Sequence, residues 1–379
     1  MNILLSSCTH WWNAEAHYAA VLAEGLRAAG HRVWMLTQPD TRNANQLVDR
    51  GLDVVTDIPV WTGNPLAWPG VRARLAEFQA RHGIHIVNVF RSREFPLHLW
   101  AARATPGVRV VRTRGTARRI RGHWLNRRMH RACGGLIVSA EALRADMLRS
   151  LKLPPDAVRT VYFPAPPPLG WSEQRRDEGK QRLLAELGFA PDRVVLAIVG
   201  RATPEKGHSR LLDAFQEARR THPSAALVIV DKRYEDEAPH RARLEVQARH
   251  QGLSPHVRWL GFRQDVRQIM ASVDLGVIPS LTSELNCRVA MEFFSAGTPV
   301  VAFPTGALPE VIENDVTGVV TKDHEPHTLA GVLGVLVGNA DLRRHLARHA
   351  LKAAQERFSQ GQFLEATLEV YQRALAKPG

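Results

Sequence analysis

Two glutamates in the second half of the chain, Glu284 and Glu292, follow an apolar run that we expect to be a buried strand. Glu284 should lie in the loop after the strand, and a helix should begin at Asn286 or Cys287. Glu292 then lies a turn or more inside that helix, next to the core, where it needs a ligand or a buried partner. Free N–H groups of Asn286, Cys287 and Arg288 suit a phosphate, and carboxylates accept hydrogen bonds from sugar hydroxyls.

A second candidate site is the segment GRATPEKG at 200–207, between an apolar run at 194–199 and an expected helix at 208–220. Arg201, Lys206 and the start of the helix would meet at the end of a strand. Such a place binds anions, because helix N–H groups and two cations favour phosphate. The spacing of a P-loop is absent.

The net charge of +13 is concentrated in one half of the chain. Residues 1–165 hold 23 Lys and Arg against 11 Asp and Glu, a net +12, whereas the remainder has a net +1. Ten arginines and no acid lie between Glu94 and Glu141. This excess indicates an anionic partner, either nucleic acid, a membrane surface or a phosphorylated substrate, although a solvated basic face is the alternative.

Two of these arginines, Arg112 and Arg114, follow an apolar run at 108–111. We expect them to project from the strand end into a cleft, with plain surface charge as the alternative. Trp11 and Trp12 are candidates for a sugar platform, a membrane contact or simple packing.

The three cysteines, Cys8, Cys133 and Cys287, have no metal-ligand spacing and no disulfide pattern, which fits a reducing cytoplasm. No apolar run approaches about 18 residues, so we expect no transmembrane helix.

Short apolar runs alternate with amphipathic stretches, which predicts βαβ units and parallel sheets. A proline-rich stretch at 163–170 cannot continue a helix or a sheet, and we place a domain boundary there. The expected fold is α/β, with two doubly wound Rossmann-like domains facing across a cleft. The expected domains are 1–165 and 166–358, followed by an amphipathic helix in 359–379. The expected strands are 2–5, 32–36, 84–89, 108–111, 135–138, 193–199, 226–230, 257–260, 275–279 and 299–302.

Together these segments resemble glycosyltransferase family 4, the retaining nucleotide-sugar-dependent enzymes of the GT-B fold. The resemblance is carried by 200–207, by the Glu284 and Glu292 pair, and by AGTPVVAFPTGALPEVI at 296–312. It also includes 261–266 and 274–280, in order and spacing. The end of the chain resembles the closing helix of the family, which implies that 359–379 packs back on the first domain.

The resemblance implies that Glu284 contacts the donor sugar or phosphate, that Glu292 contacts the ribose, and that cations hold the diphosphate. The implied catalytic residues are Arg201, Lys206 and Glu284. The implied donor site comprises Gly200, Arg201, Lys206, Phe262, Glu284, Asn286, Cys287, Arg288 and Glu292. The acceptor candidates are Asn13, Arg91, Arg112 and Arg114.

The chain departs from the family pattern at several positions. The first loop, 11–15, lacks the usual glycines, and the usual histidine is missing at 88–93. Leu285 and Asp231 replace glycines on the donor side. The first two departures affect the acceptor side, where no general base is assigned.

We therefore expect a retaining hexosyl- or heptosyltransferase that uses a nucleotide-diphosphate sugar and no metal or other cofactor. The expected acceptor is an anionic, lipid-linked or phosphorylated glycan, such as a lipopolysaccharide core. We expect a cytoplasmic protein, with a peripheral contact to an anionic membrane, that does not bind nucleic acid. The alternatives are a nucleotide-sugar epimerase on the same fold and a non-enzymatic nucleic-acid-binding protein.

Overall fold

The computed structural model of the chain describes residues 1–116, 118–170, 172–232, 237–282 and 284–377. It divides into two compact units. The first unit comprises Met1–Phe163 and Gly361–Gly379, and the second comprises Pro164–Gln360. No helix among the described residues is both long and apolar enough to cross a bilayer.

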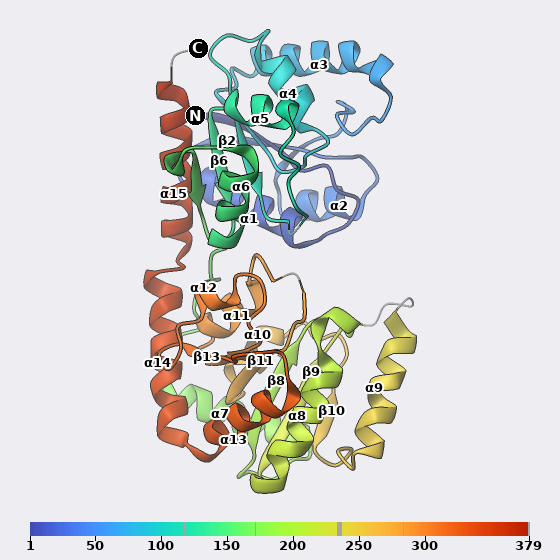
Figure 1. Cartoon of the computed structure of the whole chain (residues 1–379), viewed down its shortest axis with the longest axis vertical. Coiled ribbons are helices and arrows are strands. Elements are labelled where there is room, and N and C mark those ends of the chain that lie inside the picture. The colour runs from blue at the N-terminus through green and yellow to red at the C-terminus, as the bar shows by residue number, and fades with distance from the viewer. Residues whose placement is uncertain (117, 171, 233–236, 283, 378–379) are drawn as a thin grey trace. The chain divides into compact units, whose positions relative to one another are not determined.

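Seven parallel strands form the sheet of the first unit, in the order β3-β2-β1-β4-β5-β6-β7 (Figure 1). Helices connect successive strands, as parallel pairing requires. The strands are β1 (Asn2–Ser6), β2 (Arg32–Leu36), β3 (Asp53–Val55), β4 (Ile86–Val89), β5 (Arg109–Arg114), β6 (Gly135–Val138) and β7 (Val158–Thr160).

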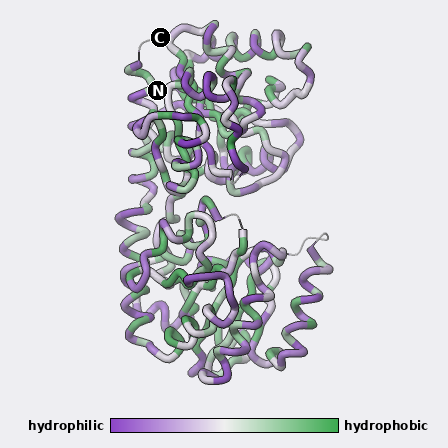
Figure 2. Tube along the Cα trace, viewed as in Figure 1, coloured by the Kyte–Doolittle hydropathy of each residue, from purple (hydrophilic) through white to green (hydrophobic). Residues whose placement is uncertain are grey.

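The last helix of the chain, α15 (Gln360–Ala376), is part of the core of the first unit. Figure 2 shows hydrophobic and hydrophilic residues alternating along it, as expected for a helix with one buried face. Phe363 packs edge-on against Tyr18, with 5.0 Å between ring centroids, and Asn88 Nδ2 donates to the Tyr371 hydroxyl at 2.7 Å. The other helices of this unit are α1 (Ala14–Ala28), α2 (Arg42–Asp49), α3 (Trp68–Arg81), α4 (Phe95–Ala102), α5 (Trp124–Arg131) and α6 (Glu141–Leu151).

Six parallel strands form the sheet of the second unit, in the order β10-β9-β8-β11-β12-β13. One of its two central strands, β8, is wholly apolar, as expected for a parallel sheet with helices on both faces. The strands are β8 (Val194–Val199), β9 (Ala225–Val230), β10 (Val257–Trp259), β11 (Leu275–Ile278), β12 (Val300–Ala302) and β13 (Gly318–Val320).

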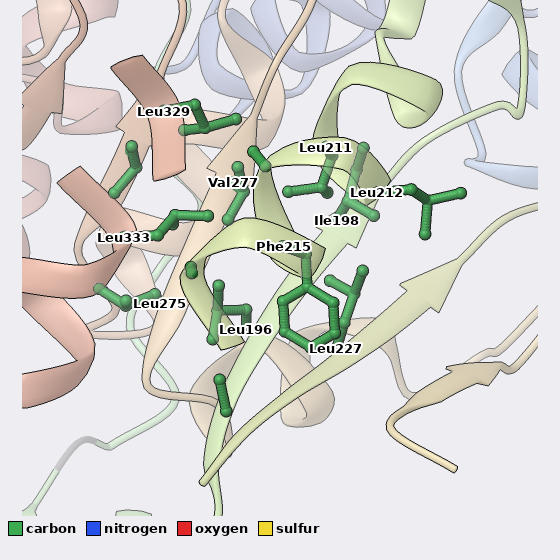
Figure 3. Close-up of a cluster of buried hydrophobic side chains, with 14 of the residues drawn as sticks. Leu196, Ile198, Leu211, Leu212, Phe215, Leu227, Leu275, Val277, Leu329 and Leu333 are labelled. Atoms are coloured by element: carbon green, nitrogen blue, oxygen red, sulfur yellow. The ribbon is translucent and has the colours of Figure 1, made fainter. Parts of the chain in front are cut away.

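A large apolar cluster packs several helices of the second unit against its sheet. Figure 3 shows Phe215 of α8 beside Leu196 and Leu227 of the neighbouring strands β8 and β9. The helices are α7 (Glu173–Glu186), α8 (His208–Thr221), α9 (Ala238–His250), α10 (Val266–Ala271), α11 (Arg288–Ser295), α12 (Leu308–Val311), α13 (Pro326–Gly338) and α14 (Ala340–Glu356).

Each sheet has one point where the strand order reverses. In the first unit it lies between β1 and β4, and in the second between β8 and β11. Loops leave the two strands in opposite directions there, which opens a crevice at their carboxyl ends, the usual ligand position in open α/β sheets.

The prediction of two parallel α/β units is confirmed, and each predicted strand corresponds to an observed one. Three short strands, β3, β7 and β13, were not predicted. The prediction that Arg112 and Arg114 follow a strand is wrong, since both lie within β5.

Candidate functional site

Two loops of the second unit meet where its strand order reverses. Gly207, at the end of the loop after β8, has a left-handed backbone with φ of +71°, and a Cβ there would lie 1.9 Å from the carbonyl oxygen of Pro279. The N–H of Leu281 donates to the carbonyl oxygen of Glu205 at 2.8 Å. Only glycine allows this approach, which holds the start of α8 against the loop after β11.

Glu284 lies at the junction of these loops, and its side chain is largely buried. Its Oε1 accepts a hydrogen bond from the Nζ of Lys206 and another from the Oγ of Ser280, the latter at 2.8 Å. A small pocket here is lined by these three side chains and by Gly200. The geometry brings the cation and the carboxylate of the two predicted segments into direct contact.

A third loop, after β12, holds the backbone of Glu284. The N–H of Ala307 donates to the Glu284 carbonyl oxygen at 2.7 Å, and a Cβ on Gly306 would lie 2.3 Å from the same oxygen. Thr305 Oγ1 donates to the carbonyl oxygen of Ser280 at 2.5 Å. The position of the carboxylate is therefore fixed by three βα loops.

The N-terminus of α11 is adjacent to Glu284. Cys287, the N-cap, is in the left-handed region with φ of +46° and gives the helix no side-chain cap. Among the described residues, the backbone N–H groups of Asn286, Cys287 and Arg288 donate no hydrogen bond. Asn286 Oδ1 is buried without a partner in the described part of the chain. This end of the helix therefore presents several donors suited to an anion.

Glu292 has the partner that its place next to the core requires. Arg288, one turn earlier, lies with its Nε 3.2 Å from the Glu292 Oε1. Burial raises the pKa of Glu292, whereas Arg288 and Arg267 act in the opposite direction. Arg288 contacts Oε1, so the other carboxylate oxygen of Glu292 can accept further hydrogen bonds.

Two more predicted donor residues, Arg201 and Phe262, follow the ends of β8 and β10. Arg201 forms an ion pair with the buried Glu237. Phe262 is 64% exposed, and the Nζ of Lys232 lies 5.4 Å from its ring centroid. A separate pocket, lined in part by Lys232, Glu237 and Arg241, lies beside Arg201.

The predicted acceptor residues of the first unit separate into two groups. Asn13 caps α1 by accepting from the Ala16 N–H, and Arg91 lies 3.5 Å from the buried Glu15. Burial raises the pKa of Glu15, and the charges of Arg91 and Arg112 lower it. Asn13 and Arg91 are thus near one another at the start of α1.

Arg112 and Arg114 are buried, so neither the expected projection nor plain surface charge describes them. Arg112 donates to the carbonyl oxygen of Val89 at 2.8 Å and to Ser92 Oγ at 3.0 Å. Burial lowers the pKa of Arg112 to about 10, and it stays charged at neutral pH. Arg112 therefore ties β5 to the loop after β4.

A buried polar network at the strand reversal of the first unit was not predicted from the sequence. Ser6 Oγ donates to Glu94 Oε2 at 2.6 Å, the Cys8 N–H donates to Oε1 at 3.1 Å, and His98 Nε2 lies 2.9 Å from Ser6 Oγ. Burial raises the pKa of Glu94 to about 7 and lowers that of His98 to about 3. Ser6 and Cys8 are far in the sequence from Glu94 and His98, and the two pairs meet only through the pairing of β1 with β4.

Comparison with known proteins identifies the family. Residues 16–164 match the model of Glycosyltransferase Family 4, and residues 179–353 match that of the glycosyl transferases group 1. The alpha-maltose-1-phosphate synthase of Mycolicibacterium smegmatis is 30% identical over 318 residues, which cover 78% of this chain and 74% of that protein. The chain belongs to the family 4 glycosyltransferases.

Other relatives of this family 4 glycosyltransferase match a smaller part of it. The D-inositol 3-phosphate glycosyltransferase of Jonesia denitrificans is 33% identical over 204 residues, covering 52% of this chain and 47% of that protein. The chain spans about half the length of the curated relatives that it matches first. The structure of Anabaena HepE in complex with UDP superposes with a TM-score of 0.80 at 19% identity, over 98% of this chain and 100% of that one. This likeness shows the same fold.

In this glycosyltransferase, most predicted donor residues gather around two adjoining features. Lys206, Glu284 and the start of α11 form one site at the ends of β8 and β11, and Arg201 and Phe262 lie toward β9 and β10. Two further residues of these features were not predicted from the sequence: Ser280, which donates to Glu284, and Glu237, which pairs with Arg201. Ser280 directly follows a predicted strand, and that position was the available signal.

Proposed function

We propose that the chain transfers a sugar from a nucleoside-diphosphate sugar to an anionic glycan, with retention of configuration at the transferred carbon. The observation that carries the proposal is the contact of Lys206 with Glu284 beside the uncapped start of α11. A cation, a carboxylate and several N–H donors at one strand edge are suited to a sugar diphosphate.

In the proposed reaction, the bond between the sugar carbon and the diphosphate breaks, and that carbon forms a bond to a hydroxyl oxygen of the acceptor. Negative charge increases on the departing phosphate, and the nucleoside diphosphate leaves with the hydroxyl proton. Lys206, Arg201 and the N–H groups at 286–288 would stabilise that charge, as preorganised donors do. Glu284 would orient the sugar, and Glu292 would accept hydrogen bonds from the ribose hydroxyls. Because the chain supplies the positive charge, the proposed reaction needs no metal ion.

The identity of the donor and acceptor is a further part of the proposal. Anabaena HepE, which shares the fold, is in complex with UDP, and uridine nucleotides are therefore the first donors to test. The relatives from Jonesia denitrificans and Mycolicibacterium smegmatis are named for inositol 3-phosphate and maltose 1-phosphate, both of which carry a phosphate. The net charge of +12 on residues 1–165 suits an anionic acceptor, and we propose a phosphorylated or lipid-linked glycan such as a lipopolysaccharide core.

A thermal-shift screen with nucleoside diphosphates of different bases tests the donor site. We expect one base to raise the melting temperature, and we expect Lys206→Ala and Glu292→Ala to abolish the increase. Arg344→Ala is the matched control, because Arg344 pairs with Asp341 on the exposed surface of α14 in the same unit. If no nucleotide raises the melting temperature of the wild type, the proposed donor site is wrong.

Product analysis then tests the reaction. NMR of the glycoside should show the anomeric configuration of the donor, in the presence of EDTA as well as without it. An inverted product would contradict retention, and loss of transfer in EDTA would contradict the metal-free reaction. Epimerisation of the nucleotide sugar in the absence of an acceptor would favour the epimerase instead.

A further inference from the structure

Helix α5 of the first unit presents an unusual face to solvent. Trp124 is 72% exposed and Leu125 is 44% exposed, and Arg128 and Arg131 are exposed too. At about 100° per residue, these four side chains lie within an arc of about 120° of the helix. His130, on the other side, is buried. We call the four exposed residues the α5 face.

The segment just before this helix adds three exposed arginines, Arg118, Arg119 and Arg121. Within the described part of the chain, the guanidinium groups of these three and of Arg128 form no ion pair or hydrogen bond with protein groups. Other arginines of the chain do pair with acids, for example Arg50 with Glu24 in the first unit and Arg348 with Glu173 in the second.

The pattern of charges explains why these cations have no acidic partner. The nearest acids along the chain are Glu94 and Glu141, with none between them. A surface that only maintains solubility mixes both signs of charge. Here one sign surrounds an aromatic and an aliphatic side chain, so the surface suits a partner that is both anionic and apolar.

We propose that the α5 face, together with Arg118, Arg119 and Arg121, docks the protein on an anionic lipid surface. Tryptophan favours the interface between headgroups and hydrocarbon, and leucine gains by insertion there, while arginines bind lipid phosphates. Nucleic acid would satisfy the arginines but would leave Leu125 in water. The inference does not depend on the proposed transferase activity, because it concerns binding alone.

Cosedimentation of the whole chain with lipid vesicles tests the proposal. We expect binding to vesicles of phosphatidylcholine with about 30% phosphatidylglycerol, little binding to phosphatidylcholine alone, and weaker binding as salt rises. Each arginine near an anionic surface contributes roughly fivefold in affinity, from about 1 kcal/mol each. Replacing Arg118, Arg119 and Arg121 by Gln should therefore reduce affinity by at least tenfold.

The apolar contribution is tested by a separate variant. Trp124→Ser with Leu125→Ser should reduce binding to the anionic vesicles by at least tenfold without altering the melting temperature, because both side chains are exposed. Leu66→Ser is the matched control, since Leu66 is 89% exposed elsewhere in the same unit. Arg344→Gln with Arg348→Gln is the charge control. Neither control should change vesicle binding.

Three results would overturn the proposal. They are equal binding to neutral and anionic vesicles, unchanged binding of the Trp124→Ser/Leu125→Ser variant, and an equal loss of binding in the controls. Duplex DNA and single-stranded RNA are measured in parallel. The face would instead be a nucleic-acid surface if DNA or RNA binds more tightly than the vesicles do. That binding would have to depend on the arginines and not on Trp124 and Leu125.

Discussion

Lys206 donates a hydrogen bond to Oε1 of Glu284, although 78 positions separate the two residues in the sequence. The same oxygen accepts from Ser280, so the carboxylate is held by one charged and one neutral donor. The Glu284 side chain is 11% exposed and that of Lys206 is 30% exposed. A diphosphate at the start of α11 would be a second anionic partner for Lys206 in the proposed donor complex.

The first prediction concerns this ion pair. Lys206→Met should lower kcat by at least about 100-fold, because a cation is removed from the departing phosphate. Glu284→Gln keeps an acceptor for Ser280 but loses the charge, and we expect a smaller loss of stability than for Glu284→Ala. Urea unfolding of Lys206→Met, of Glu284→Gln and of the variant that carries both changes gives the coupling energy between the two side chains. We expect it to be about 1 kcal/mol. A coupling energy of zero would show that the contact has no energetic role.

The second prediction concerns the glycine that lets two loops meet. Gly207→Ala places a Cβ against the Pro279 carbonyl oxygen at a left-handed backbone position, so the loops must separate. We expect a loss of about 3 kcal/mol or more in the free energy of unfolding, together with loss of nucleotide binding. Gly331→Ala, in α13 with open space around it, should instead raise stability by about 0.5–1 kcal/mol. Equal stability of the two variants would contradict the close approach.

The third prediction concerns pH and Glu94. Its pKa is raised from 4.5 to about 7 in the folded state, so the folded protein holds this proton more tightly than the unfolded chain does. Its contribution to stability is complete below about pH 4.5 and is lost as the pH rises through about 7. The difference in unfolding free energy between the wild type and Glu94→Gln should therefore change by about 2 kcal/mol between pH 5 and pH 8. Denaturant titrations at the two pH values measure it, and a constant difference would exclude the raised pKa.

The fourth prediction separates two arginines that were both expected to bind the acceptor. Arg112→Ala removes a buried guanidinium that bonds Val89 and Ser92, and we expect a loss of about 2–4 kcal/mol in stability. Arg91→Ala, which has a half-exposed side chain, should change stability by less than about 1 kcal/mol. If Arg91 binds the acceptor, this variant should raise the KM for acceptor about tenfold and leave that for the nucleotide sugar unchanged. Stability is read from urea unfolding, and an unchanged KM for acceptor would place Arg91 outside the acceptor site.

The sequence alone predicted the α/β class, the family and most of the longer elements. A strand such as β8 can be recognised as an apolar run, because a parallel strand with helices on both faces of its sheet buries its residues on both sides. The segments around Lys206 and Glu284 could also be recognised as candidate sites, since each directly follows such a run. The places of these segments at strand ends indicated a site, and the resemblance to the family implied which of their residues bind the donor.

Only the tertiary structure decided which of these residues touch. Lys206 meets Glu284 because β8 and β11 are neighbours in the sheet, an order that no local pattern contains. The same long-range pairing assembles Ser6 and Glu94 from β1 and the loop after β4. It also buries Arg112, whose charge suggested exposure, because the carbonyl and hydroxyl groups that accept its hydrogen bonds come from elsewhere in the chain. Burial of a polar group depends on such partners, and a sequence pattern records only the group itself.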